Sequence, residues 1–188
     1  MSLHNEEVQT ATSEVTNIVT TIVETERLRL RTLSTQDAAF YLSLVNDPSF
    51  IKNIRDKGVR TIADAENTIR TGHQEVQAKQ GFSLYLIETK NEARPMGLCG
   101  LVKREQLPGL DLGYALLPAF WRQGYAEEAC RAVIELTKTK LQQAQLYAIV
   151  SPHNNASSKL LEKLGFQFLE TIDWTDGPVL FYRLNFND

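Results

Sequence analysis

Hydrophobic and polar residues alternate along several short segments, and this alternation predicts the strands of the protein. Residues 27–33 alternate strictly between leucine and polar side chains, which places the leucines on one face of a strand. The same kind of pattern predicts further strands at residues 82–88, 96–102, 110–117, 145–150, 166–172 and 179–184. Because polar turns join the strands between residues 82 and 117, we expect them to form an antiparallel meander.

Apolar residues at helical spacing predict helices between these strands. Ser34-Thr-Gln-Asp37 is typical of a capping box and predicts a helix through Val45. A second helix is predicted from Thr61 to about Gln80, where Gly81 stops it, and residues 50–60 before it read as irregular. A long helix with a core-facing stripe follows Gly124, and a short helix covers residues 155–164.

The predicted order is β-α-α-β-β-β-α-β-α-β-β, which indicates an α/β fold with a mixed sheet and helices on both faces. The long helix lets the strands at 110–117 and 145–150 lie parallel, and the rest of the sheet is expected to be antiparallel. Residues 1–23 are predicted to be an N-terminal tail or an extra edge strand, since apolar residues recur only from Val15 to Val23. Residues 24–188 have the length of a single domain.

Composition and charge exclude several classes of function. The net charge is −3 and no run of lysine or arginine occurs, so the electrostatic footprint of a nucleic-acid-binding protein is missing. No segment approaches the roughly 20 apolar residues of a membrane span. Cys99 and Cys130 lie in apolar patterns and are expected to be reduced core residues. These features predict a cytoplasmic protein, a monomer or a homodimer, without nucleic-acid or membrane partners.

The candidate chemistry begins where the strand at 110–117 ends and the long helix starts. The intervening stretch reads Trp121-Arg-Gln-Gly-Tyr-Ala-Glu-Glu-Ala129. A glycine-bearing loop that runs into a helix presents free backbone N–H groups at the positive end of the helix dipole. This arrangement predicts a phosphate site, in which Gly124 and Ala126 let the backbone approach the ligand.

Two motifs resemble those of a known family. Trp121-Arg-Gln-Gly124-Tyr-Ala126 resembles the acetyl-coenzyme A motif of the GNAT acetyltransferases, although Trp121 stands at the usual Gln or Arg position. Asn154-Asn-Ala-Ser157, with Leu-Glu-Lys-Leu-Gly-Phe166 after it, is similar to the signature of the ribosomal-protein N-terminal acetyltransferase branch. The resemblance covers about residues 24–186 and implies a GNAT-like acyl-CoA acyltransferase fold with acetyl-CoA as cosubstrate.

The resemblance also implies which residues bind the cofactor. Backbone N–H groups would hold the pyrophosphate, and the positive charge of Arg122 would assist them. A backbone N–H on the earlier strand would polarise the thioester carbonyl. We assign this last role to Leu116. The pantetheine arm would pair with the strand around Leu116 and Leu117 and contact Asn154, whose other role is a helix N-cap. The implied cofactor-binding residues are Leu116, Leu117, Arg122, Gln123, Gly124, Tyr125, Ala126, Asn154 and Ser157.

Acetyl transfer to an amine calls for a base and an acid on opposite sides of the reacting carbon. Asp111 is the candidate base, and its alternative role is a strand-end carboxylate in solvent. Ser157 is the candidate hydrogen-bond donor to the sulfur, and its alternative role is to bond to backbone in the first helical turn. Tyr114 is expected in the core, and Tyr125 is expected to lean over the cofactor.

Other polar residues have simpler interpretations. His73 and His153 have no metal-ligand spacing, so both are expected to be surface histidines and no metal is predicted. Asp173, Trp174 and Asp176 form a turn that is either a solvated hairpin or a border of the acceptor site. Residues 46–60 are a candidate specificity region, with a solvated connector as the alternative.

The leading interpretation is an N-acetyltransferase that transfers the acetyl group directly from acetyl-CoA to a primary amine. The acceptor is expected to be a protein N-terminus or a small amine such as a polyamine or an aminoglycoside. The alternative is a non-catalytic acyl-CoA-binding module that keeps the cofactor loop without a working acid and base. A P-loop enzyme is disfavoured because the stretch at 121–129 lacks Gly-Lys-Ser/Thr.

Overall fold

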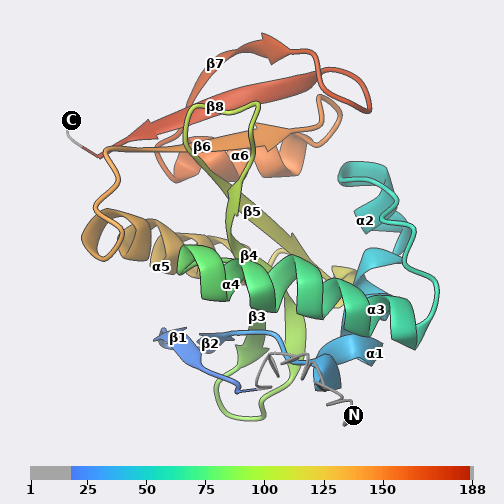
Figure 1. Ribbon diagram of the computed structural model, residues 1–188. Coiled ribbons are helices and arrows are strands. Elements are labelled where there is room, and N and C mark those ends of the chain that lie inside the picture. Colours follow the sequence, from blue (N-terminus) through green and yellow to red (C-terminus); the bar gives the residue numbers. More distant parts are fainter. Residues whose placement is uncertain (1–17, 187–188) are drawn as a thin grey trace, which may run out of the picture.

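The computed structural model describes residues 18–186, so the polar tail at 1–14 and the first part of the 15–23 segment lie outside the described residues. An eight-stranded sheet has the order β1-β2-β3-β4-β5-β6-β8-β7 (Figure 1). Its strands are Thr21–Glu24 (β1), Leu28–Arg31 (β2), Leu84–Thr89 (β3), Pro95–Lys103 (β4), Leu110–Leu116 (β5), Gln145–Val150 (β6), Gln167–Ile172 (β7) and Val179–Asn185 (β8). The mixed sheet confirms the expected fold class, and β1 pairs antiparallel with β2 at one edge.

The helices lie where the pattern predicted them, with two differences. They are Ala38–Val45 (α1), Pro48–Asn53 (α2), Ile62–Ile69 (α3), Glu75–Gln80 (α4), Tyr125–Thr139 (α5) and Asn155–Lys163 (α6). The irregular reading of 50–60 is wrong for its first part, because Asp47 accepts a hydrogen bond from the Ser49 N–H and starts α2 with Pro48 at its first position. The predicted helix 61–80 is interrupted by a π-helical turn at Arg70–Gln74.

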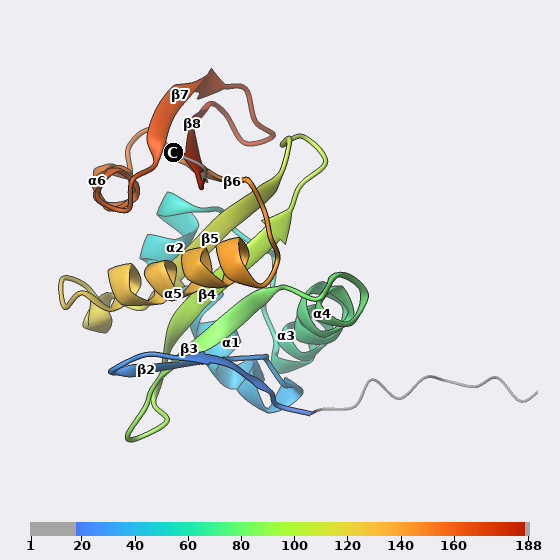
Figure 2. The ribbon, with the colours of Figure 1, turned by 90° about the vertical axis from the view of Figure 1, so that its left-hand side faces the viewer.

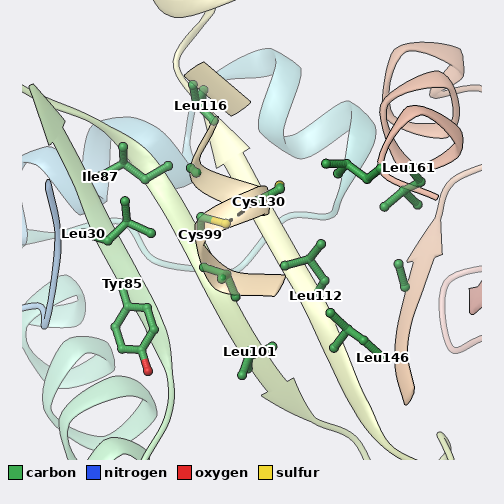
Figure 3. Packing of buried hydrophobic residues seen from close by; sticks show 14 of the residues in the cluster. Leu30, Tyr85, Ile87, Cys99, Leu101, Leu112, Leu116, Cys130, Leu146 and Leu161 are labelled. Carbon is green, nitrogen blue, oxygen red and sulfur yellow. Dashed lines mark hydrogen bonds between the residues drawn. The ribbon is translucent and has the colours of Figure 1, made fainter. Parts of the chain in front are cut away.

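The sheet separates two layers of helices, as the two ribbon views show (Figures 1 and 2). On one face, α5 and α6 pack on leucines of β2, β5 and β6; on the other, α1 and α3 cover Leu33, Leu86 and Leu98. Cys99 and Cys130 are buried between β4 and α5 with their Sγ atoms 3.9 Å apart (Figure 3), and both are free thiols. The expected core position of both cysteines is confirmed.

His73 is a correction to the sequence analysis. It was expected at the surface, but it is buried in the π-helical turn, edge-on to the ring of Tyr41 and 3.4 Å from the Tyr41 hydroxyl. Burial, with the nearby charge of Lys57, lowers its pKa to about 4, so it is a neutral core residue. His153 is exposed, as expected.

The feature that positions the site is the junction of β5 and β6, the parallel pair of the sheet. Their pairing is confined to Asp111 opposite Tyr147, whereas β6 pairs with β8 on its other side from Gln145 to Val150. The two strands therefore diverge from Asp111 toward Leu116, which opens a gap in the middle of the sheet. Parallel pairing here follows from the α5 crossover and confirms the predicted topology.

Candidate active site

A cleft of about 530 Å³ occupies the gap between β5 and β6. One end is lined by the loop and first turn of α5, from Phe120 to Glu127. Its middle is lined by β5 and by the first turns of α6, and the remaining lining residues include Arg104 and Asp111 near the start of β5, together with Ser49 and Asn53 of α2 and its C-cap Ile54. Most of the residues that the two sequence motifs single out therefore surround one cavity.

The loop before α5 has the geometry of an anion site. Gly124 is the N-cap of α5 in the left-handed region, with φ of 81°, and no side chain caps the helix. By contrast, the side chains of Thr61 and Asn154 cap α3 and α6. The first N–H groups of α5 are therefore left for a ligand. Arg122 also has a positive φ, 59°, an uncommon conformation for a residue with a side chain.

Arg27, just before β2, contacts this loop, and sequence reasoning missed it. Its Nε donates to Glu128 Oε2 at 2.7 Å, its Nη1 donates to the carbonyl of Gln123 at 3.0 Å, and its guanidinium lies 4.5 Å from the centre of the Tyr125 ring. About a hundred residues separate Arg27 from these partners. No local pattern therefore carries the signal.

The end of β5 presents its backbone to the cleft at one residue and not at the next. The Leu117 N–H donates to the carbonyl of Met96 on β4. Backbone groups alternate in direction along a strand, so the Leu116 N–H points away from β4, toward the gap. The Leu116 carbonyl accepts a hydrogen bond of 2.8 Å from the Trp121 indole. Trp121 thus ties the loop to the strand.

Two of the predicted cofactor residues lie outside the cleft. Leu117 does not line it, because its N–H is used by β4, and Gln123 folds back so that its side chain donates to the carbonyl of Ala119. The predicted residues that do line the cleft are Asp111, Leu116, Arg122, Gly124, Tyr125, Ala126, Asn154 and Ser157.

Ser157 has a partner that the sequence did not reveal. The Tyr114 hydroxyl lies 2.6 Å from Ser157 Oγ and 3.3 Å from the Ser157 carbonyl, so Tyr114 is a cleft residue as well as a core residue. Burial raises the pKa of Tyr114 far above its usual value, and the phenol keeps its proton at neutral pH. Asn154 accepts the Ser157 N–H with its side chain, which confirms its N-cap role.

Asp111 is buried, with 1% of its surface exposed, so the alternative of a strand-end carboxylate in solvent is wrong. Oδ2 accepts a hydrogen bond of 2.7 Å from Arg104 Nε, while Oδ1 is buried without a partner among the described residues. Burial raises the pKa of Asp111 to about 6, although Arg104 and the backbone N–H of Ile149 oppose the shift. A carboxyl group with this pKa changes its charge close to neutral pH.

Asp111 and Tyr114 lie on opposite faces of β5. Side chains alternate along a strand, so Tyr114 shares the face of Leu112 and Leu116, which α5 and α6 cover. Asp111 points to the other face, where Arg104 lies 5.8 Å from the ring centre of Trp174. Asp111 and Tyr114 therefore approach the gap from two sides.

The raised pKa of Asp111 predicts a pH-dependent cost in stability. Between about pH 4 and 6 the folded protein binds this proton more strongly than the unfolded chain does, so stability falls as pH rises. Against Asp111→Asn, the free energy of unfolding of the wild type is expected to fall by about 3 kcal/mol over this range. Urea unfolding of both proteins at several pH values checks this, and a constant difference would contradict it.

The helix α2 borders the cleft near the ends of β5 and β6. Ser49, Asn53 and Ile54 line the cavity, and the loop after β6 holds α2 in place. Ser151 Oγ donates to the carbonyl of Asn53 at 2.9 Å, and His153 Nε2 lies 2.8 Å from the carbonyl of Lys52. Part of the 46–60 segment thus belongs to the wall of the cleft.

Residues 18–186 contain neither a cluster of metal-ligating side chains nor a membrane-spanning helix. Among these residues, no three histidine, cysteine, aspartate or glutamate side chains come together in a way that could hold a metal ion. Over the same range, no helix has the length and apolar character needed to cross a membrane.

Comparisons with known proteins agree with this geometry. The model of the acetyltransferase (GNAT) domain matches residues 27–167. YkkB of Bacillus subtilis (strain 168) is 30% identical over 85% of this chain and 92% of its own length. YoaA of the same organism, described as an uncharacterized N-acetyltransferase, is 28% identical over 78% of this chain and 82% of its own.

A solved structure extends the likeness in fold. The complex of RimL, a ribosomal-protein α-N-acetyltransferase, with coenzyme A has a TM-score of 0.77 and 16% identity over 88% of this chain and 98% of RimL. This likeness is one of fold. Since the domain model covers most of the sequence and a cleft opens where its motifs meet, the chain belongs to the GNAT family of acetyltransferases.

Proposed function

We propose that the protein is an N-acetyltransferase that binds acetyl-CoA in the β5–β6 cleft and transfers the acetyl group directly to a primary amine. The acceptor is a protein N-terminus or a small amine. The observation that carries the proposal is the placement of Asp111 and the Tyr114–Ser157 pair on opposite faces of β5, at the gap between the strands. Family membership supports the reaction class.

The donor side fits coenzyme A. The uncapped first turn of α5 offers N–H groups to the pyrophosphate, and Gly124 keeps side-chain atoms away from it. The Leu116 N–H faces the gap, where it can donate to the thioester carbonyl, a role worth roughly 3–4 kcal/mol in comparable sites. The fold shared with the RimL complex with coenzyme A supports this placement.

The proposed reaction needs no covalent enzyme intermediate. The nitrogen of a neutral amine attacks the acetyl carbon, the new C–N bond forms, and the C–S bond breaks. The proton lost by nitrogen passes to the ionised carboxylate of Asp111 through bridging water, since Asp111 and Leu116 are about 16 Å apart along the strand. The sulfur leaves as a thiolate, which the Ser157 hydroxyl stabilises by donating a hydrogen bond.

Tyr114 is a positioning residue in this scheme. Its phenol keeps its proton at neutral pH, and when it donates to Ser157 Oγ, the Ser157 proton is left free to turn toward the sulfur. The Ser157 N–H is already bound to Asn154. The serine is therefore held in one orientation from both sides, which is the preorganisation that stabilising a leaving thiolate requires.

The Tyr114–Ser157 pair predicts non-additive effects. Tyr114→Phe keeps the ring and is expected to lower kcat about tenfold, with little change in the KM for acetyl-CoA. Ser157→Ala is expected to lower kcat by a similar or larger factor. In the double variant, the Tyr114→Phe change should cause almost no further loss of kcat beyond that of Ser157→Ala, because the Tyr114 hydroxyl acts through Ser157. Steady-state kinetics of the wild type, the two single variants and the double variant complete a double-mutant cycle. If the two losses of kcat multiply fully in the double variant, the coupling of Tyr114 to Ser157 is refuted.

An acceptor screen tests the proposed function itself. Release of free thiol from acetyl-CoA is followed with N-terminal peptides, polyamines, aminoglycosides and amino acids as acceptors. Acetylation of a primary amine, confirmed by mass, supports the proposal. If calorimetry shows tight binding of acetyl-CoA and no amine is acetylated, a non-catalytic acyl-CoA-binding module is the better description.

A further inference from the structure

The side of the cleft away from α5 is where an acceptor would enter under the proposed function, and we call it the acceptor end. It is bordered by Arg104 and Asp111 near the start of β5 and, closer to the ends of β5 and β6, by Ser49 and Asn53 of α2 and by its C-cap Ile54. The first turn of α5 borders the opposite side of the cleft. The charges around this acceptor end therefore bear on which amines the protein accepts.

Positive charge exceeds negative charge at the acceptor end. Asp111 is the one carboxylate that lines it, and Arg104 already pairs with Asp111. Within the described part of the chain, no carboxylate lies at ion-pair distance from Arg55 or Lys57, in the segment that follows α2. Their neighbours Asp56 and Arg60 neutralise each other. Glu127, at the donor end, is bound by Arg131 and Lys163.

Lys57 is close enough to Arg104 for the two charges to interact, although neither Lys57 nor Arg55 lines the cleft. The Lys57 side chain is exposed. Partial burial, together with the charges of Arg55 and Arg104, lowers its pKa to about 8. The charge of Lys57 also helps to lower the pKa of buried His73. Positive charge therefore accumulates beside the Arg104 edge of the cleft.

Arg104 has unused donors. Its Nε binds Asp111, and no described residue accepts a hydrogen bond from its two η nitrogens. Arginine presents its five N–H donors as a planar fork that matches carboxylate and phosphate groups. Asp111 Oδ1, buried and without a partner, offers an acceptor beside that fork. An amine next to an acidic group would satisfy both.

We propose that the acceptor is an amine that carries an anionic group, a carboxylate or a phosphate, close to its amino group. The inference rests on the proposed function. The amine nitrogen meets Asp111 and Arg104 holds the anion, while Lys57 and Arg55 add positive potential from outside the lining. Polyamines and aminoglycosides, which bring additional positive charges, are repelled from this end of the cleft.

Matched acceptors test the proposal in the wild-type protein. One arm uses three peptides that share an N-terminal residue followed by two acidic, two neutral or two basic residues. The other arm uses an amino acid and its amide, which separates a small acidic amine from an acidic protein N-terminus. At low salt, kcat/KM is expected to be at least about tenfold higher for the acidic than for the basic member, and the ratio should shrink with added salt.

A charge reversal tests the residue assignment. Lys57→Glu is expected to lower or invert the preference for acidic acceptors, while Lys138→Glu is the matched control. Lys138 is exposed on the last turn of α5, away from the cleft lining, and its reversal changes the net charge equally. The preference should survive in the control.

Two results would overturn the inference while leaving the proposed function intact. One is a wild-type preference for neutral or basic acceptors. The other is an acidic preference that Lys57→Glu leaves unchanged in a folded protein. If no amine in either arm is acetylated although acetyl-CoA binds, the proposed function fails and the inference fails with it.

Discussion

Asp111→Asn is expected to lower kcat by about 10²- to 10⁴-fold, because asparagine cannot take the proton of the attacking amine. Asparagine has nearly the shape of aspartate and can still accept the hydrogen bond from Arg104 Nε. The change therefore removes the base with little change in packing. Binding of acetyl-CoA, on the other side of β5, is expected to stay within about threefold, and calorimetry measures it.

The pH profile gives this prediction a second readout. A base works only when ionised, so in the wild type kcat/KM should rise with pH through about 6, the pKa of Asp111, in addition to the rise at higher pH that deprotonation of the amine itself causes. The variant should lose the lower of these two rises. Asp173→Asn, an exposed carboxylate in the β7–β8 turn, is the matched control and should behave as wild type. A folded Asp111→Asn protein with wild-type turnover would exclude Asp111 as the base.

The fold was predictable from sequence because local patterns govern most of it. Alternating residues predicted β2 to β8, and the length of the α5 crossover predicted the parallel β5–β6 pair. The helix α2 was missed because its six residues are too few for a periodic stripe, and its start depends on the side chain of Asp47. The π-helical turn at Arg70–Gln74 was missed because nothing local distinguishes it from ordinary helix.

The parts of the site that lie within contiguous sequence motifs were predictable. The parts that depend on contacts between residues far apart in the sequence were less predictable. Gly124 and Asn154 stand in contiguous motifs and line the cleft as predicted. Asp111 was placed on the right strand, but its burial and its pairing with Arg104 depend on how β4, β5 and β6 pack. Arg27 and the Tyr114 hydroxyl act on partners 43 to 101 residues away, beyond the reach of any local pattern.

At Asp111, the requirements of folding stability and of the proposed catalysis oppose each other. An ionised carboxylate buried at the strand junction costs free energy at neutral pH, and the unpartnered Oδ1 adds to that cost. A residue selected for packing alone would be apolar at this position, like Leu110 and Leu112 beside it. The cost is understandable if Asp111 has to accept a proton, which ties the stability prediction to the kinetic one.

Gly124→Val is expected to weaken coenzyme A binding about 10- to 100-fold. This loss of affinity is larger than the reduced folding stability of the variant would cause by itself. A β-branched residue at a φ of 81° is strained by about 1–3 kcal/mol, and its Cβ would stand 3.2 Å from Arg27 Nη2. The loop must shift to relieve this, and each charge-assisted hydrogen bond that it loses to the pyrophosphate is worth about 1.5–3 kcal/mol. That loss corresponds to the expected change in Kd.

Gly81→Val separates strain from binding. Gly81 has nearly the same φ, 78°, at the end of α4, and nothing lies within 4 Å of the Cβ that a side chain would add. Both variants should lose a similar part of their free energy of unfolding, measured in urea, while calorimetry should find a weakened Kd for coenzyme A in Gly124→Val alone. Equal, wild-type binding by a folded Gly124→Val protein would mean that the pyrophosphate does not lie on this loop. Equal weakening in both variants would mean that strain alone, and not the approach of backbone to phosphate, controls affinity.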